Sequence, residues 1–316
     1  MTVVERTDAL VTVPPRPGRL RRLRESPVLT NRQSLAGIAI LSLVILTALI
    51  GPFFLHGDVQ AKVGPVFAPP SHRFWLGTDG GGSDMLGLLV VGARVSLLVG
   101  FASAAVSVLI GGLIGLLSGF FGGKTDIVLM RITDYMLVLP DIPLMIVVAA
   151  LFGRSLTNII LIIGAIYWTS TARLLRAQVK SVRERVYVHR ARALGAGNTR
   201  LIFRHVLPQV MPLLVANTVL FVAYAIFAET FITFLGLGDP TAVSWGRLIQ
   251  NSFQDDAIIN NAWWAVVPPG VAVVIVVVAC TMVGQAMEDA FNPRLRSGHL
   301  SVHRFRLRRV PPKELS

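Results

Sequence analysis

The stretch VSLLVGFASAAVSVLIGGLIGLLSGFF, residues 95–121, contains no charged residue. About 20 mostly apolar residues in a helix cross the hydrocarbon core of a bilayer, so this stretch predicts a transmembrane helix. Working outward from it, five more apolar stretches have comparable character: residues 34–55, 127–152, 156–171, 211–235 and 263–282. We therefore predict an all-α integral membrane protein with six transmembrane helices. The stretch 127–152 is the least uniform of the six, because it contains Arg131, Asp134 and Asp141.

The composition of the whole chain agrees with this prediction. Of its 316 residues, 53% are hydrophobic and 15% are charged, whereas a soluble domain carries about 25% charged residues. A soluble globular enzyme and a disordered chain are both excluded. Cys280 is the only cysteine, which excludes a disulfide framework and any cysteine-based metal cluster.

The basic residues lie on one side of the six-helix topology. The net charge is +13, and 25 of the 30 Lys and Arg fall before residue 34, at positions 124 and 131, within 172–210, or after residue 282. The positive-inside rule therefore predicts that both termini and the 172–210 segment are cytoplasmic. Membrane topology accounts for the positive charge, so we expect no nucleic-acid binding.

The sequence lacks the motifs of a nucleotide-binding protein, an intramembrane protease and a metal-binding protein. Residues 118–125, SGFFGGKT, approach a nucleotide-binding P-loop, but Ser118 stands at its first glycine position and a membrane helix precedes it instead of a strand. None of the six histidines lies within a predicted transmembrane helix, which excludes a Ser–His intramembrane protease. No cluster has metal-ligand spacing. We therefore expect no catalytic residue and no metal site, and classify the chain as a non-enzyme.

The segment between the fourth and fifth apolar stretches carries the most specific pattern. Residues 173–208 read RLLRAQVKSVRERVYVHRARALGAGNTRLIFRHVLP. Tyr187, Ala191 and Leu194 follow helical spacing, and Gly195 and Gly197 are expected to break that helix. We predict a short amphipathic helix over residues 187–198, placed to dock in a groove of a partner; a solvated basic linker is the alternative.

This segment resembles the coupling loop of ABC importer permeases, in the spacing of Ala191, Gly195 and Val206-Leu-Pro208. Other blocks narrow the resemblance: LGTD at 76–79, GARVSLLVG at 92–100, ETFITFLGLG at 229–238, SWG at 244–246 and DAFNPRLR at 289–296. Together they are similar to the C-type permease subunit of dipeptide and oligopeptide importers. The family's Glu-Ala-Ala is here His189-Arg190-Ala191, so its acidic residue is absent.

The resemblance implies a type I ABC importer permease fold. The expected divisions are a basic cytoplasmic tail (1–33), the first transmembrane helix (34–55), an extracytoplasmic loop (56–92), a permease core (93–296) with five helices and the coupling loop 173–210, and a second basic cytoplasmic tail (297–316).

The resemblance also implies a set of partners and a location. They are a homologous B-type permease, two ATP-binding subunits or one fused ATPase, an extracytoplasmic substrate-binding protein and the bilayer of a bacterial cell membrane. ATP and Mg²⁺ would be bound by the ATPases, so no cofactor is expected in this chain. The residues expected to couple to the ATPase are Tyr187, His189, Arg190, Ala191, Leu194, Gly195 and Ala196.

Two acidic residues in the predicted helices are candidates for the translocation path, since charges within a membrane are functional candidates. Asp141 follows Pro140 near the middle of its span and would attract a peptide's amino terminus; a pairing inside the bundle is the alternative. Glu229 lies near the outer end of the fifth helix, where we favour structural pairing with Arg94 or Arg247. Arg131 and Asp134 are spaced for a local ion pair.

The predicted function is transport of peptides across the membrane, with this chain forming half of the path. Two alternatives stay open: the same importer carrying haem or a metal complex, and an ion-coupled secondary transporter. No clear internal repeat of the kind typical of secondary transporters is found among the six stretches.

Overall fold

The computed structural model describes residues 31–55 and 58–291. Both basic tails, including the stretches 16–24 and 299–309, therefore lie almost entirely outside the described residues. The described part is helical and contains no named strand. Its elements are α3 (Arg32–Phe54), α4 (Met85–Phe121), α5 (Gly123–Val138), α6 (Asp141–Phe152), α7 (Leu156–Arg183), α8 (Val186–Ala193), α9 (Asn198–Leu201), η1 (Ile202–Val206), α10 (Leu207–Ile232), η2 (Thr233–Leu237), α11 (Trp245–Gln254) and α12 (Trp263–Phe291).

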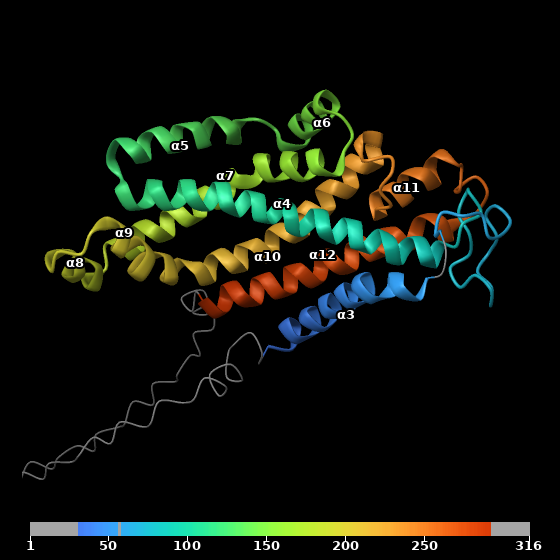
Figure 1. The fold of residues 1–316 in the computed structure, drawn as a ribbon, viewed down its shortest axis with the longest axis horizontal. Coiled ribbons are helices and arrows are strands. Elements are labelled where there is room, and N and C mark those ends of the chain that lie inside the picture. The colour runs from blue at the N-terminus through green and yellow to red at the C-terminus, as the bar shows by residue number, and fades with distance from the viewer. Residues whose placement is uncertain (1–30, 56–57, 292–316) are drawn as a thin grey trace, which may run out of the picture.

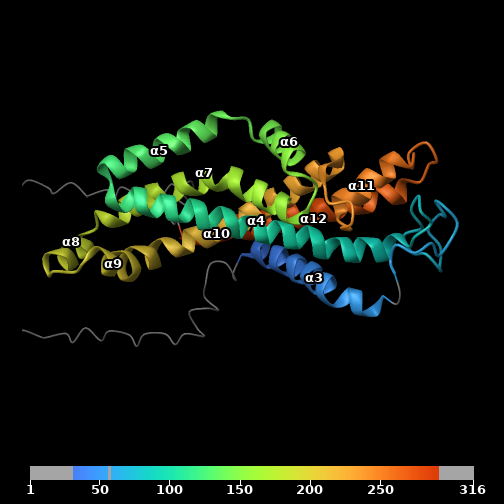
Figure 2. The ribbon, with the colours of Figure 1, turned by 45° about the horizontal axis from the view of Figure 1, so that its top comes forward.

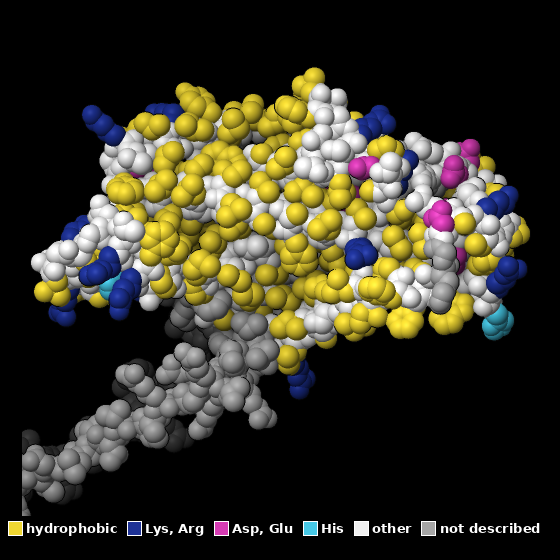
Figure 3. Space-filling model, in the orientation of Figure 1, with side chains coloured by type: hydrophobic (Ala, Val, Ile, Leu, Met, Phe, Trp, Pro, Cys, Tyr) yellow, Lys and Arg dark blue, Asp and Glu magenta, His cyan; other side chains and the backbone are white. Residues whose placement is uncertain are grey.

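The long helices lie side by side along one axis (Figure 1). We call one end of this bundle the α8 end, since it carries α8 and α9, and the other the α11 end, since it carries α11 and the loop 58–84. Within residues 31–55 and 58–291, five helical segments are long and apolar enough to cross a membrane, and the pair α5 and α6 makes a sixth crossing if it is one broken span. Apolar side chains cover the middle of one face, while most Lys and Arg side chains visible there lie toward the two ends (Figure 3). The predicted all-α architecture is confirmed.

The third span is sharply bent. The apolar stretch 127–152 predicts a single span with a kink at Pro140, and in the structure α5 and α6 meet at 89° around Leu139 and Pro140. Leu139 and Pro140 are both extended in the structure, as proline disfavours a helical residue before it and removes one backbone donor. Figure 2 shows α5 running along the bundle and α6 turning toward the α11 end.

Several helix boundaries differ from the prediction. The second helix begins at Met85, ten residues before the predicted 95, because Asp84 caps it by accepting from the Gly87 amide at 3.1 Å. Arg94 is therefore helical and exposed at the surface. The loop shortens correspondingly, and Thr78 fastens it to the bundle by accepting, through its carbonyl oxygen, a 3.2 Å hydrogen bond from Trp264 Nε1.

The fifth span also begins earlier than predicted. The predicted stretch begins at residue 211, but α10 begins at Leu207 and continues from η1, so both Pro208 and Pro212 lie inside it. The η1 segment is a π-helical turn, in which backbone hydrogen bonds join residues five apart instead of four. This change of register comes just before Pro208, which has no amide donor. The helix therefore runs through residues that usually end one.

A seam of small residues joins α4 to α7. Ser107, Gly111, Gly115 and Gly119 recur every fourth position on α4, and the α7 backbone lies against the three glycines. A Cβ atom added at Gly115 would lie 2.6 Å from the Ala172 carbonyl oxygen. The close approach of helices at such small-residue faces is typical of membrane proteins, and it fixes the position of α7, whose far end leads into α8.

Candidate functional site

The segment that the sequence singled out projects from the α8 end of the bundle (Figure 1). Its helix, α8, is shorter than the predicted 187–198, since it ends at Ala193 and is followed by a turn before α9. Val188 anchors it: this side chain is 1% exposed and packs in a cluster with Leu201 and Val206. Leu194 was expected to share an apolar face with Tyr187 and Ala191, but it lies beyond the helix and is 89% exposed.

Gly195 forms the turn that ends α8. Its φ is +87°, a conformation that side-chain-bearing residues adopt only at a cost. The Gly195 amide donates to the Arg192 carbonyl at 2.9 Å, and the Ala196 amide donates to the Ala191 carbonyl at 3.1 Å, which satisfies the last carbonyls of the helix as in an αL C-cap. An added Cβ at Gly195 would meet nothing within 4 Å, so backbone conformation, and not space, selects glycine here.

The seven residues expected to couple to a partner are brought together in this projection. Ala191 and Ala196 are half-buried, and the other five are exposed: Tyr187, His189, Arg190, Leu194 and Gly195. His189 Nε2 lies 3.3 Å from Glu184 Oε2. The neighbouring Arg183 guanidinium, more than His189, holds the pKa of Glu184 below its usual value. The projection therefore presents basic and apolar groups on a short, capped helix.

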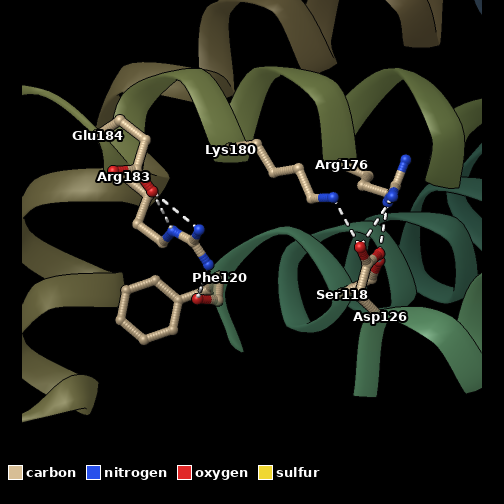
Figure 4. Close-up of polar contacts among 7 residues, drawn as sticks. All are labelled: Ser118, Phe120, Asp126, Arg176, Lys180, Arg183 and Glu184. Carbon is tan, nitrogen blue, oxygen red and sulfur yellow. Dashed lines mark hydrogen bonds and ion pairs between the residues drawn. The ribbon is translucent and has the colours of Figure 1, made fainter. Parts of the chain in front are cut away.

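An ion cluster, missed by the sequence analysis, fastens the helices behind this projection (Figure 4). Asp126 of α5 accepts from Arg176 Nη2 at 2.8 Å and from Lys180 Nζ at 2.6 Å, both from α7, and also from Ser118 of α4. Three residues beyond Lys180, Arg183 donates to the Phe120 carbonyl at 3.0 Å. We call Ser118, Asp126, Arg176 and Lys180 the Asp126 cluster.

A second ion pair between α5 and α7 differs from the predicted one. Asp134 was expected to pair with Arg131 on its own helix, but its carboxylate lies 2.6 Å from Arg173 Nη2 of α7. Ion pairs across α5 and α7 thus replace a local pair. Helical spacing alone identifies only local partners, because the antiparallel approach of α7 is a property of the fold.

Asp141 is the first residue of α6, immediately after the bend. It lines a pocket of about 320 Å³ between the bent span, α7 and α10. The other lining residues are Leu137, Tyr167, Thr169, Ser170, Asn217, Leu220, Phe221 and Tyr224. The pocket combines aromatic and hydroxyl groups with one carboxylate, and it is the described cavity that contains a candidate path residue.

Glu229 occupies a different environment. Its side chain is 1% exposed, and its carboxylate accepts from Thr233 Oγ1 at 3.0 Å and from Ser96 Oγ at 3.4 Å. The Ser96 hydroxyl in turn accepts from the Trp245 amide at 3.2 Å. The expected pairing with Arg94 or Arg247 is wrong: the partners are hydroxyl groups, and Glu229 ties α4 and α10 to the start of α11.

Metal ligation has no support in the described residues, where no group of three or more His, Cys, Asp and Glu side chains could hold an ion. Cys280 is buried in α12.

Comparison with known proteins adds an independent observation to this geometry. Residues 111–297 match the family model described as "Binding-protein-dependent transport system inner membrane component". This match covers more than half of the chain and contains α7 to α12 with the α8 projection. The chain belongs to this family.

Individual members of the family match over most of their length. The chain is 34% identical to the oligopeptide transport system permease protein OppC of Bacillus subtilis (strain 168) over 84% of its own length and 87% of the relative. It is also 34% identical to the dipeptide transport system permease protein DppC of the same organism, over 87% of its length and 85% of the relative. The resemblance to ABC importer permeases of the peptide type is thereby confirmed.

Family membership fixes the general role of the chain. It is a multi-pass membrane permease component, and permeases of this kind work with an ATPase, a binding protein and a further permease. The type I permease fold, predicted from the resemblance, is also confirmed.

Proposed function

We propose that the chain is the C-type permease subunit of an ATP-driven importer for peptides. Its relatives are named as oligopeptide and dipeptide permeases, and the match extends over both the core and the α8 projection. Within this assembly it forms half of the translocation path beside a homologous B-type permease. An extracytoplasmic binding protein delivers the substrate.

The projection 186–197 carries the proposal of coupling. It is held to α7 by the buried Val188 and ended by the αL glycine Gly195, while its basic and apolar side chains face outward. A short, rigid helix of this kind fits a groove in a partner. We assign that partner as the ATPase, present as two subunits or one fused chain, which binds the ATP and Mg²⁺ that this chain does not need to bind.

The orientation follows from charge. Of the 30 Lys and Arg, 25 belong to the tails, to the α4–α5 hairpin region or to 172–210, and such residues remain on the cytoplasmic side. We therefore propose that the α8 end and both termini lie in the cytoplasm of a bacterial cell, and that α11 and the loop 58–84 lie on the outer side. Of the two path candidates, we assign Asp141 to the path and Glu229 to the helix packing described above.

The test compares two glycines in the complete transporter, in which the chain is co-expressed with its partner subunits. Gly195→Val places a β-branched residue at φ +87°, whereas Gly197→Val places it at φ −68°, where it is tolerated. Neither Cβ meets an atom within 4 Å, so the two variants differ in the cost of the turn, about 1–2 kcal/mol. We measure co-purification of the ATPase, peptide-stimulated ATP hydrolysis and peptide uptake.

The expected result is that Gly195→Val inserts normally but loses most of its stimulated hydrolysis and uptake, while Gly197→Val retains both. Normal import by Gly195→Val would refute the coupling role. A chain that purifies alone and still moves solute would refute the importer and favour the ion-coupled carrier. Uptake of haem or a metal complex in place of peptides would keep the assembly and change the substrate.

A further inference from the structure

The pocket at the bend of the third span has an unusual charge balance. The α5–α6 span carries three carboxylates, and two of them are paired with basic residues of α7: Asp126 with Arg176 and Lys180, and Asp134 with Arg173. Asp141 has no ion-pair partner among the described residues, and no Lys or Arg lines its pocket. A carboxylate in a membrane helix normally has a partner or faces a cavity.

A capping hydrogen bond does not account for this carboxylate. Pro140 is the N-cap residue of α6, and the first turn of that helix receives no side-chain cap hydrogen bond. Asp84 shows the contrast, since its carboxylate caps α4 directly. Asp141 is therefore available to a group that enters the pocket.

The lining of the same pocket contains a second group without a hydrogen-bond partner among the described residues. The side chain of Tyr167 is 8% exposed, and its hydroxyl is buried with no hydrogen-bond partner in the described residues. Buried hydroxyl groups are normally hydrogen-bonded. The Tyr167 ring packs edge-to-face against Tyr224, with centroids 4.7 Å apart, and against Phe221, at 5.5 Å.

Asn217 adds an acceptor to this wall. Its Nδ2 group donates to Thr171 Oγ1 at 3.3 Å, so its carbonyl oxygen is left for another group. The pocket thus offers a carboxylate, an amide oxygen and aromatic ring faces, and the unpartnered hydroxyl of Tyr167 is buried in its lining. A compact cation with several N–H donors satisfies all of them, because it pairs with the carboxylate, donates to neutral oxygens and is attracted to aromatic rings.

We propose that this pocket binds the primary ammonium group of the transported solute, which for a peptide is its free amino terminus. The inference rests on the proposed function and specifies the chemistry of one site on the path. An α-amino group has a pKa of about 7.7–8.0, so it is largely protonated at neutral pH. The pocket volume, about 320 Å³, is at the lower end of the range for small-molecule sites and suits the end of a peptide.

The experiment uses a photoreactive dipeptide, photo-leucyl-alanine, and its N-acetylated counterpart, which lacks the ammonium group. Each probe is illuminated with the complete transporter in membranes, and labelled positions are mapped by mass spectrometry. The variants are Asp141→Asn, which removes the charge at nearly constant shape, and Asp141→Glu, which keeps it. Asp134→Asn is the matched control, because it removes a carboxylate of the same span that lies outside the pocket. Thermal melting of each variant confirms that it is folded.

We expect the free-amine probe to label the segments containing Tyr167 and Tyr224 in the unmodified chain, the Asp134→Asn variant and, more weakly, the Asp141→Glu variant. Labelling falls about tenfold or more in Asp141→Asn and with the acetylated probe, since each removes one charged partner of the proposed ammonium–carboxylate pair. Equal labelling by both probes, labelling insensitive to Asp141→Asn, or no labelling of these segments would overturn the proposal.

Uptake of the same two probes separates this inference from the proposed function. If neither probe is imported while labelling still depends on the charge of Asp141, peptide import is refuted and the ammonium site stands. If both probes are imported at equal rates and labelling does not depend on Asp141, the importer stands and the ammonium site is refuted.

Discussion

The Asp126 cluster and the Asp134–Arg173 pair provide a controlled comparison on one helix. Both carboxylates belong to α5 and both pair with α7, but the Asp126 side chain is 11% exposed and has two cationic partners, whereas the Asp134 side chain is 52% exposed and has one. Burial raises the cost of leaving a charge unpaired. The two substitutions to asparagine should therefore differ in their effect on stability.

The magnitude follows from these exposures. Breaking a buried ion pair costs about 3–5 kcal/mol, and breaking an exposed one costs about 0–1 kcal/mol. Arg176 and Lys180 are 32% and 37% exposed, so they recover part of their hydration when Asp126 is neutralised. We expect Asp126→Asn to lower the free energy of unfolding by about 2 kcal/mol, and Asp134→Asn by about 0.5 kcal/mol or less.

The assay is reversible unfolding in mixed micelles, titrated with sodium dodecyl sulfate and followed by tryptophan fluorescence. Added salt screens the exposed pair more than the buried one, so the difference between the two variants should persist at high salt. Equal destabilisation by the two substitutions, or no measurable effect of Asp126→Asn, would show that the cluster does not fasten α5 to α7 as described.

Three further outcomes follow from the packing. Gly115→Val should prevent folding into the stable bundle, because its Cβ would lie 2.6 Å from the Ala172 carbonyl oxygen, and the fraction of monodisperse protein after detergent extraction measures this. Glu229→Ala should lower the free energy of unfolding by about 2–4 kcal/mol and Glu229→Gln by much less, since glutamine keeps an acceptor for the buried hydroxyls; equal losses would contradict the hydrogen-bond assignment. Asp239 accepts from the Leu156 amide and, chiefly, from Thr241, which holds its pKa below the usual value. Its contribution to stability is therefore present above about pH 4 and is lost as pH falls through the lowered pKa, so Asp239→Asn should flatten the melting temperature against pH in that range.

The sequence predicted the helical architecture well where composition changes abruptly. Helix α4 ends at Phe121 as expected, and α7 and α12 begin at Leu156 and Trp263 as expected. At these points an apolar stretch meets glycine or polar residues, so the local chemistry alone determines the boundary. Hydropathy is less informative at the α8 end of α7, where the helix continues through basic residues to Arg183 and two of them, Arg176 and Lys180, pair with Asp126 of α5.

The bend of the third span could not be derived from hydropathy. Pro140 marks a break, but proline occurs inside α10 without ending that helix. The difference lies in the neighbouring structure: η1 precedes Pro208, while Leu139 and Pro140 adopt extended conformations with no such compensation. The outcome depends on tertiary packing, which a single sequence does not display.

The candidate site was predictable in position and less so in its details. The projection at 186–197 contains all seven residues expected there, because the glycines and helical spacing are local signals. Val188 was missed as its anchor, since burial against Leu201 and Val206 requires knowledge of how the chain folds back. The hydroxyl partners of Glu229 were missed for the same reason, as Ser96 is 133 residues away in the sequence.

The seam between α4 and α7 has a mechanical consequence. Where glycine brings two backbones into contact, no flexible side chain lies between them to absorb a relative displacement. A shift of α7 by one residue, about 1.5 Å along its axis, would move its backbone atoms out of the space that the three glycines leave open, and against the side chains of neighbouring α4 residues. The two helices are therefore expected to move as one rigid unit. A force applied at α8 would tilt the two helices together, and the α5–α6 span, bent by 89° around Leu139 and Pro140, is the part left to hinge.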